Sequence, residues 1–241
     1  MIISHRYRYL FVELPRTAST AISRELREFY GGERILRKHA TYHDFLKIAT
    51  PEEKQYVVFS CIRNPLDNAV SLYCKYRSDH KQKFSDPKKY KNRHRLADRV
   101  DMIRYRFIKD HDADFSTYFK RFYKIPYNDW SCMSHRDFDF VIRFENLQED
   151  FARVLRMIGI EQVRPLPVVN RTGGKERDFL AYYTPDIIPH AKHIFGPYMQ
   201  QWGYAFPPEW GDTALSWRTR MEFQFFNLFR QVYWRHLRSR I

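Results

Sequence analysis

The sequence predicts an α/β fold: a single domain with a central parallel sheet flanked by helices. Residues 56–62 form a continuous apolar run, which is typical of a strand buried on both faces of a parallel sheet. Residues 138–144 form a second apolar strand, and a helical pattern follows each of the two. Strands that alternate with helices favour a parallel sheet with right-handed crossovers.

The other elements follow from local patterns. The segments before the buried strand predict a first strand, a helix, a short second strand and a short helix, at residues 9–14, 19–30, 34–37 and 41–49. Pro65 then begins another helix, because proline suits a first helical turn. The strand at residues 138–144 leads into a helix that ends at Gly159.

Two basic stretches stand apart from this pattern. Residues 77–125 are expected to be a basic, mostly helical insert in an α/β domain that spans residues 1–208. Residues 209–241 are expected to be an amphipathic helical extension, because four apolar side chains recur at helical spacing: Phe226, Phe229, Tyr233 and Leu237. This stripe is predicted to dock on the chain's own domain, on a second copy in a homodimer, or on a membrane surface.

Composition narrows the class of protein. The net charge of +14 favours anionic partners such as nucleic acid, phosphate-bearing cofactors, acidic glycans or lipid. No apolar run is long enough for a membrane span, and the N-terminus lacks the pattern of a secretory signal. The three cysteines (Cys61, Cys74 and Cys132) lack metal-site spacing, so we expect reduced thiols, no metal and a cytoplasmic location.

The first candidate site is the turn between the first strand and the first helix. Its sequence is Pro-Arg-Thr-Ala-Ser-Thr, residues 15–20, where the helix N-terminus, three hydroxyls and a guanidinium would hold an anion such as phosphate. The alternative is that Ser19 or Thr17 only caps the helix. A nucleoside-triphosphate P-loop is excluded, because residues 11–20 contain no Gly and no Lys.

The second candidate site is Arg63, at the C-terminal end of the buried strand, with Ser71 on the following helix. Ligands of open α/β sheets bind at that edge. Arg63 and Ser71 would bind one phosphate there from two sides. The alternative is that Arg63 forms a surface ion pair and Ser71 is simply buried.

Together, FVELPRTASTAISREL and VVFSCIRNPLDNAVSLY resemble the 5′-phosphosulfate and 3′-phosphate motifs of the sulfotransferase family. A later segment from residue 140 resembles the strand-then-helix segment of that family, and one from residue 166 resembles the C-terminal part of its glycan-directed and bacterial branches. The resemblance implies the P-loop-like sulfotransferase fold and 3′-phosphoadenosine 5′-phosphosulfate as co-substrate, with no metal. Arg16 stands where the family usually has Lys, and Ala18 where it has Gly.

The resemblance also assigns residues. Its implied nucleotide contacts are Arg16, Thr17, Ala18, Ser19 and Thr20 for the 5′-phosphate, Arg63 and Ser71 for the 3′-phosphate, and Arg171 and Lys175 in a loop over the nucleotide. Arg16 would also neutralise charge on the leaving phosphate.

A base for the acceptor hydroxyl is the remaining requirement. The family uses His or Glu, and His39 follows the second strand in the sequence Lys-His-Ala-Thr, where it would lie beside the phosphate loop. We therefore predict His39 as the catalytic base, with His43 and Glu13 as alternatives.

The sequence thus predicts a sulfotransferase that acts on a hydroxyl of a carbohydrate or other glycan. Twelve Lys or Arg against four Asp in residues 77–109 favour an anionic acceptor, although such charge runs are also typical of a solvated helix face. Two other functions stay open: a basic nucleic-acid-binding module, although no nucleic-acid motif is present, and an inactive nucleotide-binding relative.

Overall fold

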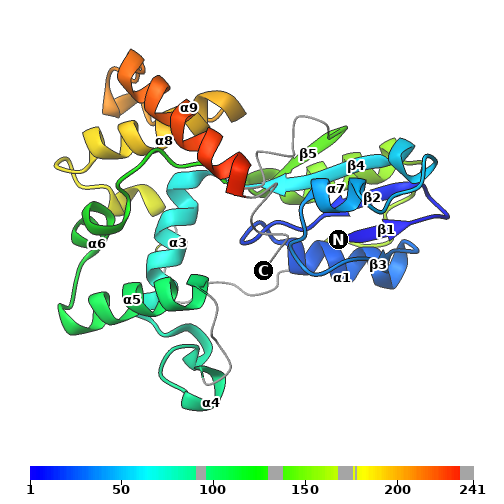
Figure 1. The fold of residues 1–241 in the computed structure, drawn as a ribbon, viewed down its shortest axis with the longest axis horizontal. Helices are drawn as coiled ribbons and strands as arrows, with labels where there is room; N and C mark the ends of the chain where they lie inside the picture. Colours follow the sequence, from blue (N-terminus) through cyan, green and yellow to red (C-terminus); the bar gives the residue numbers. More distant parts are fainter. Residues whose placement is uncertain (91–95, 130–137, 168–175, 177, 234–241) are drawn as a thin grey trace. The chain divides into compact units, whose positions relative to one another are not determined.

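The computed structural model describes residues 1–90, 96–129, 138–167, 176 and 178–233, and the chain divides into two units that alternate along the sequence. Unit 1 comprises Met1–Asn64, Asp129–Asn170 and Phe229–Ile241, and unit 2 comprises Pro65–Asn128 and Arg171–Leu228. Unit 1 contains the sheet, and unit 2 is helical (Figure 1). The predicted boundary after residue 208 stays a prediction.

Unit 1 is built on a five-stranded sheet in the order β3-β1-β2-β4-β5. The strands are β1 Ile2–Ser4, β2 Tyr9–Val12, β3 Glu33–Arg34, β4 Val57–Ile62 and β5 Phe140–Arg143. β2, β4 and β5 are parallel, with Phe11, Phe59 and Phe140 aligned across them, as the apolar runs predict. The central strands are thus parallel, but the sheet as a whole is mixed, because β1 pairs antiparallel with both β2 and β3.

Alternation of side chains gives the sheet two covered faces. Tyr9 and Phe11 pack on one face with α1 (Ser19–Phe29) and α7 (Leu147–Met157). Leu10 and Val12 pack on the other face with α2 (Tyr42–Leu46), which begins with a capping box between Thr41 and Asp44. Helices on both faces explain why β2 and β4 are buried over almost their whole length.

Unit 2 is built around α3 (Pro65–Arg77), nearly all of whose residues are buried. Its other helices are α4 Pro87–Tyr90, α5 Leu96–Asp110, α6 Phe115–Phe122, α8 Ile188–Trp202 and α9 Trp217–Val232, of which residues up to Leu228 belong to this unit. Its core is largely aromatic, with Tyr73, Phe115 and Phe119 among its buried members. Residues 77–125 are therefore largely helical where they are described; that they are an insert stays a prediction.

Short 3₁₀ turns connect several elements: η1 Glu53–Gln55, η2 His80–Gln82, η5 Phe144–Asn146, η6 Phe179–Tyr182 and η7 Pro208–Trp210.

Cys61 and Cys74 are buried free thiols, and burial raises the pKa of both thiols. Cys132 lies outside the described residues. Across the described part of the chain, no helix combines the length and apolar character needed to span a membrane.

The C-terminal helix forms as α9, and the destination of its predicted apolar stripe stays a prediction. Phe229 and Tyr233 are exposed, whereas Thr219 and Phe223 are the buried residues of α9. Leu237, the last residue of the predicted stripe, lies outside the described residues.

Candidate functional site

The turn from β2 into α1 has an unusual backbone. Arg16 and Ala18 have φ values of 68° and 59°, in the left-handed region that glycine favours. Ala18 is the N-cap of α1 and makes no side-chain cap hydrogen bond. Thr17 donates its hydroxyl to the Leu14 carbonyl (3.2 Å), so neither it nor Ser19 is the cap that the alternative interpretation requires.

This turn leads directly into the N-terminus of α1, which can hold an anion. The first N–H groups of a helix have no intrahelical partners, and they carry the positive end of the helix dipole. Ser19 and Thr20 are the first two residues of α1, and Arg16 is exposed beside them. Alternating backbone conformations of this kind turn N–H groups toward one point, as in anion-binding nests.

Lys38 is a residue of this site that sequence reasoning missed. Its Nζ donates to Thr20 Oγ1 at 3.1 Å, which brings an ammonium group to the N-terminus of α1. The phosphate motif lacks the usual lysine, and Lys38 supplies one from a segment 18 residues further along the chain. The adjacency of Lys38 to His39 in the sequence was the available signal.

His39 lies beside the same turn, as predicted. Its Nδ1 is 3.0 Å from the backbone carbonyl oxygen of Glu13, the residue that follows β2. A carbonyl oxygen only accepts, so Nδ1 carries the proton and the imidazole lone pair is on Nε2. Burial, together with the charge of Lys38, holds the pKa of His39 below its ordinary value despite the carbonyl hydrogen bond, so the neutral form dominates at pH 7.

Glu13 has a structural role in this arrangement. Its carboxylate is fully buried and accepts hydrogen bonds from Ser23 (2.5 Å), Arg34 (2.9 Å) and the Met1 ammonium (2.9 Å). Burial would raise the pKa of Glu13, but the Ser23 hydrogen bond and the two cations outweigh it and lower the pKa. A carboxylate held in this way is poorly suited to take a proton from an acceptor, which favours His39 over Glu13 as the base.

Arg63 is held at the same edge of the sheet. Its Nη1 donates to the Arg16 carbonyl (3.4 Å), and its guanidinium lies 4.2 Å from the ring centroid of Phe144. Next to it, the Asn64 N–H donates to Glu145 Oε1 at 2.6 Å. η5 therefore fixes the turn that follows β4; Phe144 and Glu145 are further residues to which the sequence analysis gave no role.

The remaining candidates are one residue of unit 1, one residue of unit 2 and two residues outside the described part of the chain. His43 is on α2, and Ser71 is buried on α3 in unit 2, whereas the phosphate turn and Arg63 belong to unit 1. Arg171 and Lys175 lie outside the described residues. The contribution of these residues to the site stays a prediction.

Within the described ranges, no group of three His, Cys, Asp or Glu side chains could hold a metal ion.

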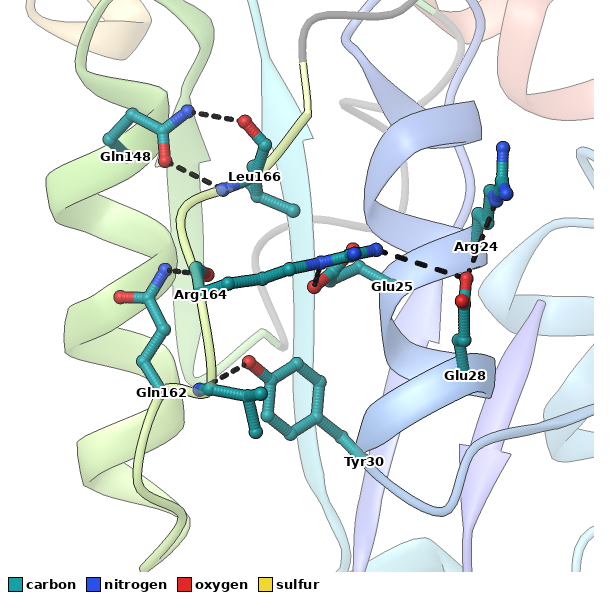
Figure 2. A network of polar contacts seen from close by, with 9 residues as sticks. Arg24, Glu25, Glu28, Tyr30, Gln148, Gln162, Arg164 and Leu166 are labelled. Carbon is teal, nitrogen blue, oxygen red and sulfur yellow. Dashed lines mark hydrogen bonds and ion pairs between the residues drawn. The ribbon is translucent and has the colours of Figure 1, made fainter.

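A polar network anchors the segment that follows α7, residues 160–167. Arg164 makes two hydrogen bonds, of 3.0 and 3.1 Å, to the buried Glu25 carboxylate on α1 and lies over the ring of Phe29. Gln148 on α7 both donates to and accepts from the backbone of Leu166 (Figure 2). The segment is thus tied to both α1 and α7 directly before residue 168.

The arrangement gathers an N-terminal helix end, Arg16, Lys38 and Arg63 around one turn, with a neutral imidazole beside them. This is the chemistry of a site that binds phosphate or sulfate esters and accepts a proton. No curated protein and no solved structure shows significant similarity to the chain. The model of the Sulfotransferase family matches residues 1–195, and the chain therefore belongs to the sulfotransferase family.

Proposed function

We propose that this protein transfers a sulfuryl group from 3′-phosphoadenosine 5′-phosphosulfate to a hydroxyl of a carbohydrate acceptor. The observation that carries the proposal is the convergence of Lys38 and Arg63 on the turn at residues 15–20, with His39 next to it. Two cations from distant parts of unit 1 at one helix N-terminus suit a ligand with several negative charges. The nucleotide supplies the activated sulfuryl group.

Each residue then has a distinct task. His39 Nε2 accepts the proton of the acceptor hydroxyl. The Nδ1–H of the same ring donates to the backbone carbonyl of Glu13 and so fixes its orientation. The α1 N-terminus, Arg16 and Lys38 stabilise negative charge on the 5′-phosphate oxygen as the sulfur–oxygen bond to it breaks. Arg63 is assigned to the 3′-phosphate, with its guanidinium plane fixed by Phe144.

The proposed acceptor is an anionic glycan. The basic composition of residues 77–109 supports it, because a cluster of Lys and Arg concentrates acidic substrates near a protein surface. Transfer of sulfate to neutral carbohydrates is the control against which transfer to anionic glycans is compared.

Two measurements on the full chain test the proposal. Calorimetry with 3′-phosphoadenosine 5′-phosphate should show binding that Arg63→Ala weakens by tenfold or more, while ATP binds less tightly. Labelled sulfate should then pass from the donor to sulfated or uronate-bearing glycans faster than to neutral glycans, phenols or peptides. Nucleotide binding without transfer to any acceptor would support an inactive relative, and absence of binding would exclude the donor.

A further inference from the structure

α9 presents an apolar stripe outward. Trp217, Met221, Phe225 and Leu228, which we call the outer stripe, follow one another at intervals of four, four and three residues, so they share one face of the helix. These residues are 70, 62, 57 and 60% exposed. The buried residues, Thr219 and Phe223, lie on the opposite face.

Polar contacts fix this orientation within unit 2. Thr219 Oγ1 is 3.0 Å from Nδ1 of His193 on α8, and Glu222 pairs with Nε2 of the same histidine at 3.1 Å. Asn227 accepts a hydrogen bond from Asn128 at 2.7 Å. Rotating α9 to bury the outer stripe would break these contacts, so the stripe is a stable surface feature of the unit.

Charge selects the occupant of this face. Arg218 and Arg220 are exposed and border the outer stripe on its two sides, and residues 213–241 contain six Arg and one Glu. A second copy docked symmetrically would bring the same arginines together, and like charges oppose such a contact. A surface of anionic lipid offers acyl chains for the stripe and phosphates for the arginines.

We propose that α9 lies in the interface of an anionic membrane, with the outer stripe among the acyl chains and Arg218 and Arg220 at the lipid phosphates. A tryptophan at the start of the stripe suits this position, because indole rings favour the headgroup boundary. The proposal concerns α9 alone and does not depend on sulfuryl transfer.

Vesicle co-sedimentation of the full chain tests it. The protein should pellet with vesicles of phosphatidylcholine mixed with phosphatidylglycerol, and much less with phosphatidylcholine alone. The double variant Met221→Ser/Leu228→Ser should lower the partition coefficient by about tenfold or more, because two apolar side chains are lost from the bilayer. Ile103→Ser on α5, where Ile103 is 58% exposed, is the matched control and should change nothing.

Variants of the two arginines test membrane binding independently of the outer stripe. Arg218→Gln/Arg220→Gln should weaken binding by about tenfold and reduce its dependence on salt. Equal binding to neutral and anionic vesicles, or no binding by the unaltered chain, would overturn the proposal even if the serine variant failed to fold. A lipid-free dimer, detected by light scattering and dissociated by the serine variant, would overturn it in favour of a second copy.

Discussion

The ring of Phe144 lies against the guanidinium of Arg63, 4.2 Å from its carbon to the ring centroid. Arg63 is only 8% exposed, so the ring both shields and orients a cation that would otherwise sample many rotamers. The contact joins the end of β4 to η5 and makes the aromatic residue part of the candidate site.

Phe144→Leu should weaken binding of 3′-phosphoadenosine 5′-phosphate by about tenfold, because the cation–π contact that orients Arg63 is lost. Phe144→Tyr should restore most of the affinity. Calorimetry measures both, and Phe140→Leu is the control, since Phe140 contacts Arg153 instead. Equal losses in the two leucine variants would show a general packing effect.

His39→Asn should lower kcat by about 10²-fold or more with nucleotide affinity nearly intact, because only the base is removed. Asparagine suits the left-handed backbone of this position, where φ is 62°. His43→Asn is the control. A large loss in the control with little change in the His39 variant would transfer the role of base to His43.

The pH profile of the unaltered enzyme should show its acidic limb below pH 6.5, because burial lowers the pKa of His39 and the base acts unprotonated. The same lowered pKa means that the unfolded chain binds this proton more tightly than the folded one. The contribution of His39 to stability is therefore complete above about pH 6.5 and is lost as the pH falls through the folded-state pKa. Measurement of kcat/KM and of the melting temperature against pH tests both statements.

Lys38→Gln should reduce kcat by about tenfold to 10²-fold, because a cation at the leaving phosphate is lost. It should also move the acidic limb to higher pH, since the charge of Lys38 lowers the pKa of His39. Lys38→Arg should keep the limb in place, and the neighbouring Arg37→Gln is the control. A fall in activity with an unmoved limb would contradict the proximity of the two groups.

Ala18→Gly should leave the free energy of unfolding unchanged or raise it by up to about 1 kcal/mol. Glycine relieves the left-handed strain at φ 59°, and its greater freedom in the unfolded chain offsets part of that gain. Ala21→Gly within α1 should instead cost about 1 kcal/mol. Denaturant unfolding compares the two, and a similar loss in both would contradict the strain at Ala18.

The sequence predicted the parts of the fold that local pattern determines. The continuous apolar run at residues 56–62 marked β4, and the helical spacing after Ser19 marked α1 to within one residue. β1 was missed because three residues carry too little periodicity, and their strand character comes from pairing with β2 and β3. Tertiary pairing of this kind leaves no local signature.

The sequence could predict the motifs of the candidate site but not the contacts between them. Arg63 and the turn at residues 15–20 were recognisable from their spacing, but the contact of Lys38 with Thr20 depends on how β3 and the segment after it fold back. The sequence pattern likewise did not determine which face of α9 is buried. Apolar residues occupy more than one side of that helix, and the contact of Thr219 with His193 decides which side faces α8.

The separation of β4 from β5 has a consequence for synthesis on the ribosome. β4 ends at Ile62 and pairs with β5, which begins only at Phe140, after most of the helices of unit 2 have been translated. Until then the nascent chain carries an open strand edge of the sequence Val-Val-Phe-Ser-Cys-Ile, a segment of the kind that recruits other chains. We therefore expect efficient production of this protein to depend on protecting one sheet edge until residues 140–143 leave the exit tunnel.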